Sequence, residues 1–259
     1  LSMNGGIKVC FFTNNGGVRS NNEDSLLIGD RVIHTVSMDA PETVTLNVEN
    51  ALLCVADGIG GEQKGEVASR MVLESLSATR DRITDMSSIE GLLIHAKEQL
   101  DHYASENPDA FNLGTTIAGI SIRDENIIAF NAGDCRVYRI NGSYFEQVTR
   151  DHSVVQNLFD EGIITEEEMR HHPRRNVVTS SVSGDGSRNS VHVFMTELRI
   201  RENDQFFICC DGIWGCFSHD ELEMIYRRFP GPEYCEKILG AALARKATDN
   251  ISAILIRIS

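Results

Sequence analysis

The sequence lacks several features that would place it in a specialised class of protein. No apolar run approaches the length of a membrane-spanning helix, and no signal-peptide pattern opens the chain. Linkers rich in glycine, proline or serine, internal repeats and low-complexity tracts are also missing. We therefore expect residues 1–259 to form one globular domain that spans no membrane.

Positive charge is scarce, because 24 lysine and arginine residues stand against 38 aspartate and glutamate residues, with a net charge of −14 at pH 7. Nucleic-acid phosphates are bound by clustered lysine and arginine. The pairs Arg174-Arg175 and Arg227-Arg228 are too small to form such a surface, so we expect no nucleic-acid partner. The acidic excess fits an ordinary solvated surface, or a carboxylate cluster that divalent cations neutralise.

The seven cysteines do not have the spacing of a metal-binding cluster. Cys10, Cys54, Cys209 and Cys210 lie in apolar, strand-like runs, where cysteine behaves as a small hydrophobic residue. An odd set of such thiols is typical of a reducing compartment. We therefore expect a cytoplasmic protein without disulfide bonds.

The hydrophobic pattern predicts strands in consecutive runs and helices in pairs. Strands are predicted over residues 7–13, 25–29, 31–36, 51–56, 115–122, 126–132, 136–140, 191–196, 205–210 and 251–258, with an antiparallel meander over 115–140. Helices are predicted over residues 65–78, 153–161, 165–170 and 218–229, from Pro232, and from a capping box at Ser87-Ser88-Ile89-Glu90 to Tyr103. This order argues against a parallel βαβ fold and favours antiparallel sheet of the α+β type with helix layers outside.

Aspartates lie where four of the predicted strands begin or end. Asp57 and Asp211 each follow an apolar run, Asp134 follows the run over 126–132, and Asp249 directly precedes the last strand. Acidic side chains gathered at one end of a sheet repel one another unless cations neutralise them or protons bind. Oxygen ligands without a histidine or cysteine cluster favour Mg²⁺ or Mn²⁺ over Zn²⁺. For any single Asp-Gly pair, an independent turn is the alternative interpretation.

Short motifs connect these aspartates with other polar residues. In chain order they are Arg19-x-x-Asn22-Glu23-Asp24-Ser25, Asp57-Gly58-Ile59-Gly60-Gly61, Gly65-Glu66-Val67-Ala68-Ser69, Gly114-Thr115-Thr116, Gly133-Asp134-Cys135-Arg136, Asp151-His152-Ser153, Asp211-Gly212-Ile213-Trp214 and Asp249-Asn250. The ordered set resembles the metal-dependent protein phosphatase family, also called PPM or type 2C, from about Gly17 to the C-terminus. The segment from Asp151 to Asn176 resembles the bacterial branch, in which it forms a flap beside the active site.

The resemblance implies a four-layer α-β-β-α sandwich, in which two antiparallel sheets are flanked by antiparallel helix pairs. It implies hydrolysis of phosphoserine and phosphothreonine in proteins, in opposition to a bacterial Ser/Thr kinase. Two Mn²⁺ or Mg²⁺ ions that share a bridging carboxylate would lower the pKa of a water molecule between them, which makes a nucleophile for in-line attack on phosphorus. A third, weaker ion is also implied, and a flap subdomain over residues 153–176 is expected to influence substrate choice.

The family motifs imply roles for individual residues. Asp57 would bridge two ions, the Gly58 carbonyl would bind one, and Asp211 with Asp249 would complete the other. The remaining implied metal-site residues are Glu23, Asp24 and, at the third ion, Asp134. Arg19 would hold the substrate phosphate in a bidentate fork, so that Arg19 and Asp57 are the expected catalytic residues. Without the metal context, Arg19 reads as a solvated surface residue.

The chain departs from the family pattern at three positions. Ile59 stands where animal members carry the histidine proposed as general acid, so protonation of the leaving oxygen needs another donor. Cys135 replaces the usual serine, and Gly215 stands where some members have a second carboxylate for the third ion, which should therefore bind weakly.

Asp151 and His152 suggest a catalytic pair, but we expect a structural role in which Asp151 hydrogen-bonds a turn.

Two other functions stay open from the sequence alone. The same fold could serve as a non-catalytic module that binds phosphoproteins, although no bridging aspartate is lost here. A two-metal hydrolase of another phosphoester, such as a nuclease, is the second alternative. The acidic composition and the absence of interleaved aromatic and basic residues count against a nuclease.

Overall fold

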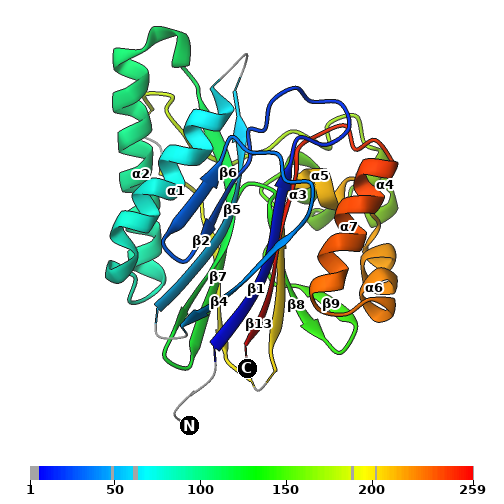
Figure 1. Cartoon of the computed structure of the whole chain (residues 1–259). Helices are drawn as coiled ribbons and strands as arrows, with labels where there is room; N and C mark the ends of the chain where they lie inside the picture. The colour runs from blue at the N-terminus through cyan, green and yellow to red at the C-terminus, as the bar shows by residue number, and fades with distance from the viewer. Residues whose placement is uncertain (1–5, 48–49, 61–63, 188–189, 202, 259) are drawn as a thin grey trace.

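Two antiparallel sheets form the centre of the fold, and a pair of helices covers the outer face of each sheet (Figure 1). This is the four-layer α-β-β-α sandwich that the sequence predicted. The computed structural model describes residues 6–47, 50–60, 64–187, 190–201 and 203–258. Gly61, which belongs to one of the motifs, lies outside the described residues.

The two sheets draw their strands from distant parts of the chain. Across the first sheet the order is β4 (Glu42–Asn47), β1 (Gly6–Asn14), β13 (Ile251–Ile258), β12 (Gln205–Cys209), β8 (Arg136–Asn141) and β9 (Tyr144–Gln147). Across the second it is β11 (Phe194–Arg199), β7 (Asn126–Ala132), β6 (Gly114–Arg123), β5 (Asn50–Ile59), β2 (Ser25–Ile28) and β3 (Arg31–His34), with β10 (Val182–Ser183) paired to β6. All strand pairs in the described residues are antiparallel.

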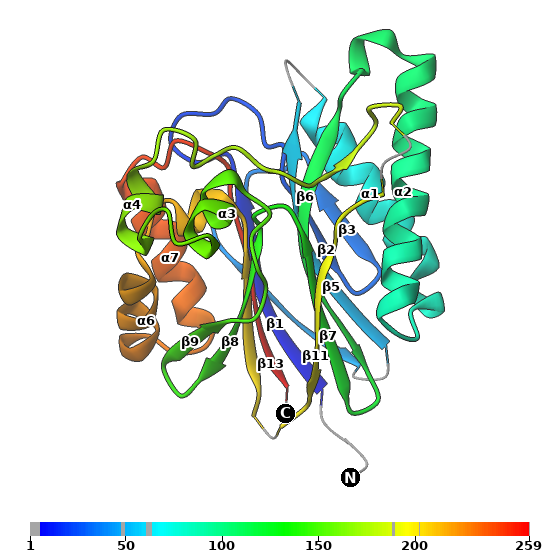
Figure 2. The same ribbon diagram turned by 180° about the vertical axis from the view of Figure 1, so that it is seen from behind.

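The helices form the outer layers. The second sheet is covered by α1 (Gly65–Thr79) and α2 (Met86–Glu106), and the first sheet is covered by α6 (His219–Arg228) and α7 (Pro232–Ala244) (Figure 1). Two short helices, α3 (Val154–Asp160) and α4 (Glu166–His171), lie in the connection between β9 and β10 (Figure 2). The four-residue helix α5 (Asp211–Trp214) directly follows β12.

The central strand β5 contributes to two hydrophobic cores. Leu53 and Val55 pack between the sheets, whereas Leu52, Cys54 and Ala56 pack beneath α1 and α2. Successive side chains of a strand point to opposite faces, so a strand buried on both faces needs a continuous apolar run. Burial of each leucine or valine side chain stabilises the fold by about 1.5–3 kcal/mol.

The bounds of several elements agree with the prediction, and others differ. β13 covers the predicted residues and α7 begins at Pro232. The second helix is not capped by the predicted serine, because Asp85 is the N-cap and accepts a hydrogen bond from the Ser88 N–H. The strand predicted from Val191 begins at Phe194. Predictions of an element's existence therefore succeed more often than predictions of its first residue.

Two predictions about the sheets are wrong. The run that ends at Ala56 continues as β5 through Ile59, so that Asp57 and Gly58 pair with β6 instead of following the strand. The predicted meander over residues 115–140 holds for β6 and β7 only. After β7 the chain crosses to the first sheet, where β8 pairs with β12 and β9.

The described residues contain no membrane-spanning helix and no disulfide bond. None of its helices combines the length and the apolar character that crossing a membrane requires. All seven cysteines are unpaired, and six of them are buried.

Candidate active site

Acidic residues from both sheets meet at one end of the sandwich. In an antiparallel pair the end of one strand lies beside the start of its neighbour, so Asp24, just before β2, lies beside Asp57 near the end of β5. The same geometry joins Asp211, just after β12, to Asp249, two residues before β13. Asp134 enters from the crossing between β7 and β8. The structure thus brings together the carboxylates that the sequence singled out.

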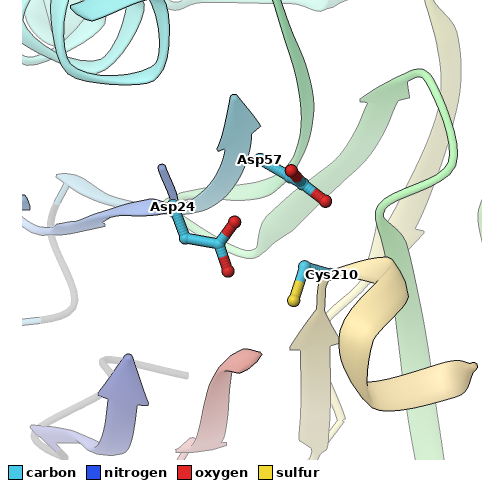
Figure 3. A group of neighbouring side chains, drawn as sticks. All are labelled: Asp24, Asp57 and Cys210. Atoms are coloured by element: carbon cyan, nitrogen blue, oxygen red, sulfur yellow. The ribbon is translucent and has the colours of Figure 1, made fainter. Parts of the chain in front are cut away.

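Asp24 is the most deeply buried member of this acidic cluster. Its side chain is fully buried, and neither carboxylate oxygen has a hydrogen-bond partner in the described residues. One ligand atom each from Asp24, Asp57 and Cys210 lie within 4.8 Å of one another. Figure 3 shows these three side chains gathered in one space. Asp24 and Asp57 therefore direct carboxylate oxygens into the same space.

Cys210 already has partners and does not act as a ligand in this arrangement. Its Sγ donates a hydrogen bond to the Asn250 carbonyl at 3.4 Å and accepts one from the Ser252 N–H at 3.2 Å. Burial, followed by the nearby aspartate charges, raises the pKa of the thiol well above its usual value. The atoms that remain available as metal ligands are therefore carboxylate oxygens, which favour Mg²⁺ or Mn²⁺.

Burial and mutual repulsion raise the pKa values of the clustered acids. Burial raises the pKa of Asp24 to about 7 against a lowering effect of the nearby Ser252 and Cys210 side chains, and the charges of Asp211 and Asp249 raise it further. Burial, then the Asp249 charge, raises the pKa of Asp211 to about 6. The pKa of Asp57 is raised well above its ordinary value by burial and by the charge of Asp24, then Asp211 and Asp134. These shifts favour protonation of the cluster, or its neutralisation by cations.

Arg19 lies at the exposed edge of the cluster. One terminal guanidinium nitrogen contacts the Asp249 carboxylate at 2.9 Å, and Nε donates to the Thr248 carbonyl at 3.4 Å. Half of the Arg19 side-chain surface is exposed, at 50%. The Asp211 carboxylate, at the first residue of α5, has a buried Oδ1 without a hydrogen-bond partner in the described part of the chain. An arginine and unpaired carboxylate oxygens are therefore neighbours.

Gly58 is required by close backbone packing. A Cβ atom at this position would lie 2.3 Å from the Gly65 carbonyl oxygen and 2.7 Å from the Glu23 carbonyl oxygen. The strand end, the start of α1 and the loop before β2 meet there, so no side chain fits. This contact accounts for the glycine independently of the metal-binding role implied for its carbonyl.

Asn250 organises the site and was not singled out by the sequence beyond its motif. Its side-chain amide donates to the carbonyls of Asn15 and Asn21 at 3.1 and 2.8 Å, and its Oδ1 accepts the Glu23 N–H at 2.8 Å. The Asn250 side chain therefore fastens the loop that carries Arg19 and Glu23 to the start of β13. Its position directly after Asp249 was the available signal.

Glu66 is a second residue whose importance the sequence did not reveal. It lies in the first turn of α1, and its Oε2 is buried without a hydrogen-bond partner in the described residues. After burial, the Glu66 charge is the main cause that raises the pKa of Glu23. An acidic residue in a first turn also stabilises a helix through its dipole, so the sequence pattern did not distinguish the two roles.

The predicted structural role of Asp151 and His152 agrees with the geometry, but the partner of Asp151 differs. Asp151 accepts hydrogen bonds from the Arg136 guanidinium at 2.7, 3.0 and 3.1 Å and from Gln147 at 3.0 Å, rather than from a turn. His152 Nδ1 accepts the Gly133 N–H at 3.1 Å, and the backbone N–H of His152 donates to the Gly133 carbonyl at 2.8 Å. The hydrogen bonds of Asp151 and His152 therefore hold the segment between β7 and β8, which carries Asp134.

A cavity of about 670 Å³ adjoins the cluster. It is lined by Asp211 and Asp249, by residues of α3 and α4, and by the segment that follows α4. The remaining lining comes from the rest of α5, from the start of α6 and from residues 245–248. The predicted flap therefore borders the same cavity as the acidic cluster, which makes this cavity the candidate substrate site.

Comparison with known proteins identifies the family. Residues 9–158, more than half of the chain, match the family model described as Protein phosphatase 2C. The chain belongs to the protein phosphatase 2C family. It is 28% identical to the serine/threonine protein phosphatase PstP of Mycobacterium tuberculosis over 93% of this chain and 43% of that protein. It is 27% identical to a putative protein phosphatase 2C-type of Streptococcus pyogenes over 96% and 97% of the two chains.

Solved structures of protein phosphatase 2C relatives have the same fold. The chain matches the crystal structure of PstP/Ppp from Mycobacterium tuberculosis with a TM-score of 0.83 and 25% identity, over 98% and 99% of the two chains. A catalytic domain of PstP, determined in complex with two manganese ions, matches with a TM-score of 0.77 and 24% identity, over 97% and 98%. The sandwich and the assignment to the bacterial branch are thus confirmed.

Proposed function

We propose that the protein hydrolyses phosphoserine and phosphothreonine in proteins and uses two Mn²⁺ or Mg²⁺ ions. The observation that carries the proposal is the Asp24 carboxylate, which is fully buried beside Asp57 and has no hydrogen-bond partner in the described residues. A buried, unpaired carboxylate is costly unless a cation or a proton neutralises it. Family membership and the phosphatase names of the bacterial relatives support the reaction type.

The residues at the acidic cluster fit divalent metal ions. The unpaired oxygens of Asp24 and Asp211 are free to accept, and their neighbours are carboxylates. When bound, the ions would neutralise the cluster and lower the pKa of a water molecule for attack on phosphorus. The residues proposed to hold two ions are Asp57, Gly58 through its carbonyl, Asp211, Asp249, Asp24 and Glu23, with Asp134 and Asp211 at a weaker third.

Arg19 is suited to bind and orient the substrate phosphate. A guanidinium has five N–H donors, and the contacts with Asp249 and Thr248 use only some of them. The ion pair restricts the side chain to the edge of the cluster, and its exposed half leaves donors available for phosphate oxygens. A phosphate held by Arg19 would therefore lie next to the carboxylates and remain accessible from the cavity.

The proposal extends to the setting in which the enzyme acts. Phosphoproteins made by a cognate Ser/Thr kinase are the proposed substrates, and the serine/threonine phosphatase names of the relatives support this class. A cytoplasmic location is also proposed, and the seven unpaired thiols support it. The flap residues that line the cavity, from α3 to Asn176, are proposed to influence which phosphoproteins are bound.

Hydrolysis of a phosphothreonine peptide with and without Mn²⁺ tests the proposal. We expect Mn²⁺-dependent release of phosphate by the native chain, and a loss of at least roughly 100-fold in Asp211→Asn. Asp81→Asn is the matched control, because Asp81 has a side chain 82% exposed and lies in the short turn after α1. A native rate no higher than that of Asp211→Asn would contradict the proposal, and absent Mn²⁺ binding would favour a phosphoprotein-binding module.

A further inference from the structure

The cavity beside the acidic cluster contains positive charge that the proposed chemistry does not use. Its lining includes the cations Arg136, Arg170, Arg175, Arg245 and Lys246. In a chain with a net charge of −14, such a concentration of cations is a local exception. Cations near a reaction site attract groups of opposite charge on the substrate, which raises specificity more than overall affinity.

Three of these cations are already paired. Arg136 contacts the Asp151 carboxylate at 2.7 Å. Arg245 contacts the Glu221 carboxylate at 2.6 Å, and Arg170 approaches the Glu166 carboxylate at 3.8 Å. These pairs also neutralise Asp151 and Glu166, which are the acidic lining residues outside the candidate metal cluster. The charges that remain are those of Arg175 and Lys246, for which the described residues contain no ion-pair partner.

The backbone at Lys246 marks this position as unusual. Lys246 follows the end of α7 with φ of 54°, a left-handed conformation in which glycine is the favoured residue. The Lys246 N–H donates to the Leu243 carbonyl at 3.0 Å. A Cβ atom on Gly17 would lie 2.6 Å from the Lys246 Cα, so the loop that carries Arg19 packs against this backbone. A lysine in this backbone conformation that also lines the cavity is a candidate for a functional side chain.

We propose that this cavity binds a second anionic group of the phosphoprotein substrate, a carboxylate or a phosphate near the residue that is dephosphorylated. Lys246 supplies a mobile ammonium, and Arg175 supplies a guanidinium that can contact two oxygens at once. The inference rests on the proposed phosphatase function and adds a substrate class to it. Substrates with acidic or multiply phosphorylated surroundings would be preferred over neutral ones.

Three phosphothreonine peptides of identical length test the preference. One has alanine on both sides of the phosphothreonine, one has glutamate there, and one has a phosphonate analogue of phosphoserine that cannot be hydrolysed. For each protein, the measured quantity is kcat/KM for an anionic peptide divided by kcat/KM for the alanine peptide. A higher ratio for the phosphonate than for glutamate assigns the site to a second phosphate, and equal ratios assign it to anions in general.

We expect the ratio to exceed one in the native chain and to fall up to about fivefold in Lys246→Asn, the size of one partly exposed ion pair. Asparagine tolerates the left-handed backbone, so this variant removes charge without adding strain. Lys246→Arg should restore the ratio, and Lys246→Asn combined with Arg175→Gln should bring it close to one. Lys237→Gln, on α7 outside the cavity lining, is the control for net charge and should leave the native ratio unchanged.

The outcomes separate the inference from the proposed function. Hydrolysis of all three peptides with a ratio of one, or an equal loss in Lys237→Gln and Lys246→Asn, overturns the inference and leaves the phosphatase function intact. If no peptide is hydrolysed, the function fails, and the cavity is tested by fluorescence anisotropy of the labelled peptides. Tighter binding of the anionic peptides that depends on Lys246 would then support the site, and equal binding would refute it.

Discussion

Replacing Asp24 with asparagine should have opposite effects on stability with and without metal. Asp24 is fully buried, and its carboxylate has no hydrogen-bond partner in the described residues. Without metal, the charged form is therefore unfavourable in the folded chain, and the neutral amide removes that cost. With Mn²⁺, the same substitution removes a proposed ligand. We expect the variant to be the more stable protein in EDTA at high pH and the less stable one in Mn²⁺.

The size of the effect in EDTA follows from the pKa of Asp24. Burial, then the charges of Asp211 and Asp249, raises this pKa from 3.8 to about 7 in the folded chain. The folded state then binds the proton more tightly than the unfolded state, so the contribution to stability is complete below pH 3.8 and is lost as the pH approaches 7. Between about pH 5 and pH 8 this loss amounts to roughly 3 kcal/mol.

Urea unfolding in EDTA at several pH values measures the difference between the two proteins. We expect the free energy of unfolding to fall by about 3 kcal/mol more in the native chain than in Asp24→Asn between about pH 5 and pH 8. The other clustered acids titrate in both proteins, so only the difference is informative. Asp81→Asn, at an exposed position, should follow the native chain. Equal losses in the native chain and in Asp24→Asn would refute the reasoning.

Addition of Mn²⁺ supplies the second half of the test. A ligand that binds only the folded state at about 100 times its Kd stabilises that state by about 2.7 kcal/mol. We expect the native chain to gain this amount at pH 8, and Asp24→Asn to gain clearly less. A variant stabilised as strongly as the native chain would exclude Asp24 from the metal site.

Three further substitutions test separate parts of the site. Gly58→Ala should lower the free energy of unfolding by about 3 kcal/mol, because its Cβ would lie 2.3 Å from the Gly65 carbonyl oxygen. Urea unfolding measures this difference, and a loss below about 1 kcal/mol would show that the backbone moves to make room. Arg19→Ala should lower kcat/KM for phosphopeptides roughly 10- to 100-fold through lost charged hydrogen bonds, and an unchanged value in steady-state assays would remove it from phosphate binding. Asp151→Asn should cost about 3 kcal/mol of stability by leaving the partly buried Arg136 without its anion. A large fall in kcat at unchanged stability would argue for a catalytic role instead.

The sequence alone was enough to predict those elements whose first or last residues carry a local signal. β13 is a continuous run of β-branched and apolar residues, and Pro232 occupies a first helical position where its missing N–H costs nothing. The pairing of strands is not a local property. Ile7 pairs with Ile258 at the other end of the chain, and no periodicity within either strand specifies that partner. The presence of helix and sheet layers could therefore be predicted from the sequence, but the order of the strands within each sheet could not.

The residues of the candidate site also differ in whether a local sequence signal marks them. Asp57 and Asp211 were predictable because each ends an apolar run, a position that the sequence displays directly. Glu66 and Asn250 were recognised only as parts of motifs, because their importance depends on neighbours distant in the chain. Asn250 fastens a loop more than 200 residues earlier, and its hydrogen bonds exist only in the folded structure.

The wrong meander and the position of Asp134 in the acidic cluster have the same physical origin. Gly133-Asp134 has the composition of a hairpin turn, which is why β8 was predicted beside β7. Gly133 instead adopts φ of 112°, and a Cβ there would lie 2.4 Å from the Thr116 side chain, so the chain leaves the second sheet at this glycine. Asp134 is then buried, and burial together with the charge of Asp211 raises its pKa. An aspartate at a hairpin tip would be solvated, so the crossing that spoils the predicted strand order is what brings Asp134 into the acidic cluster.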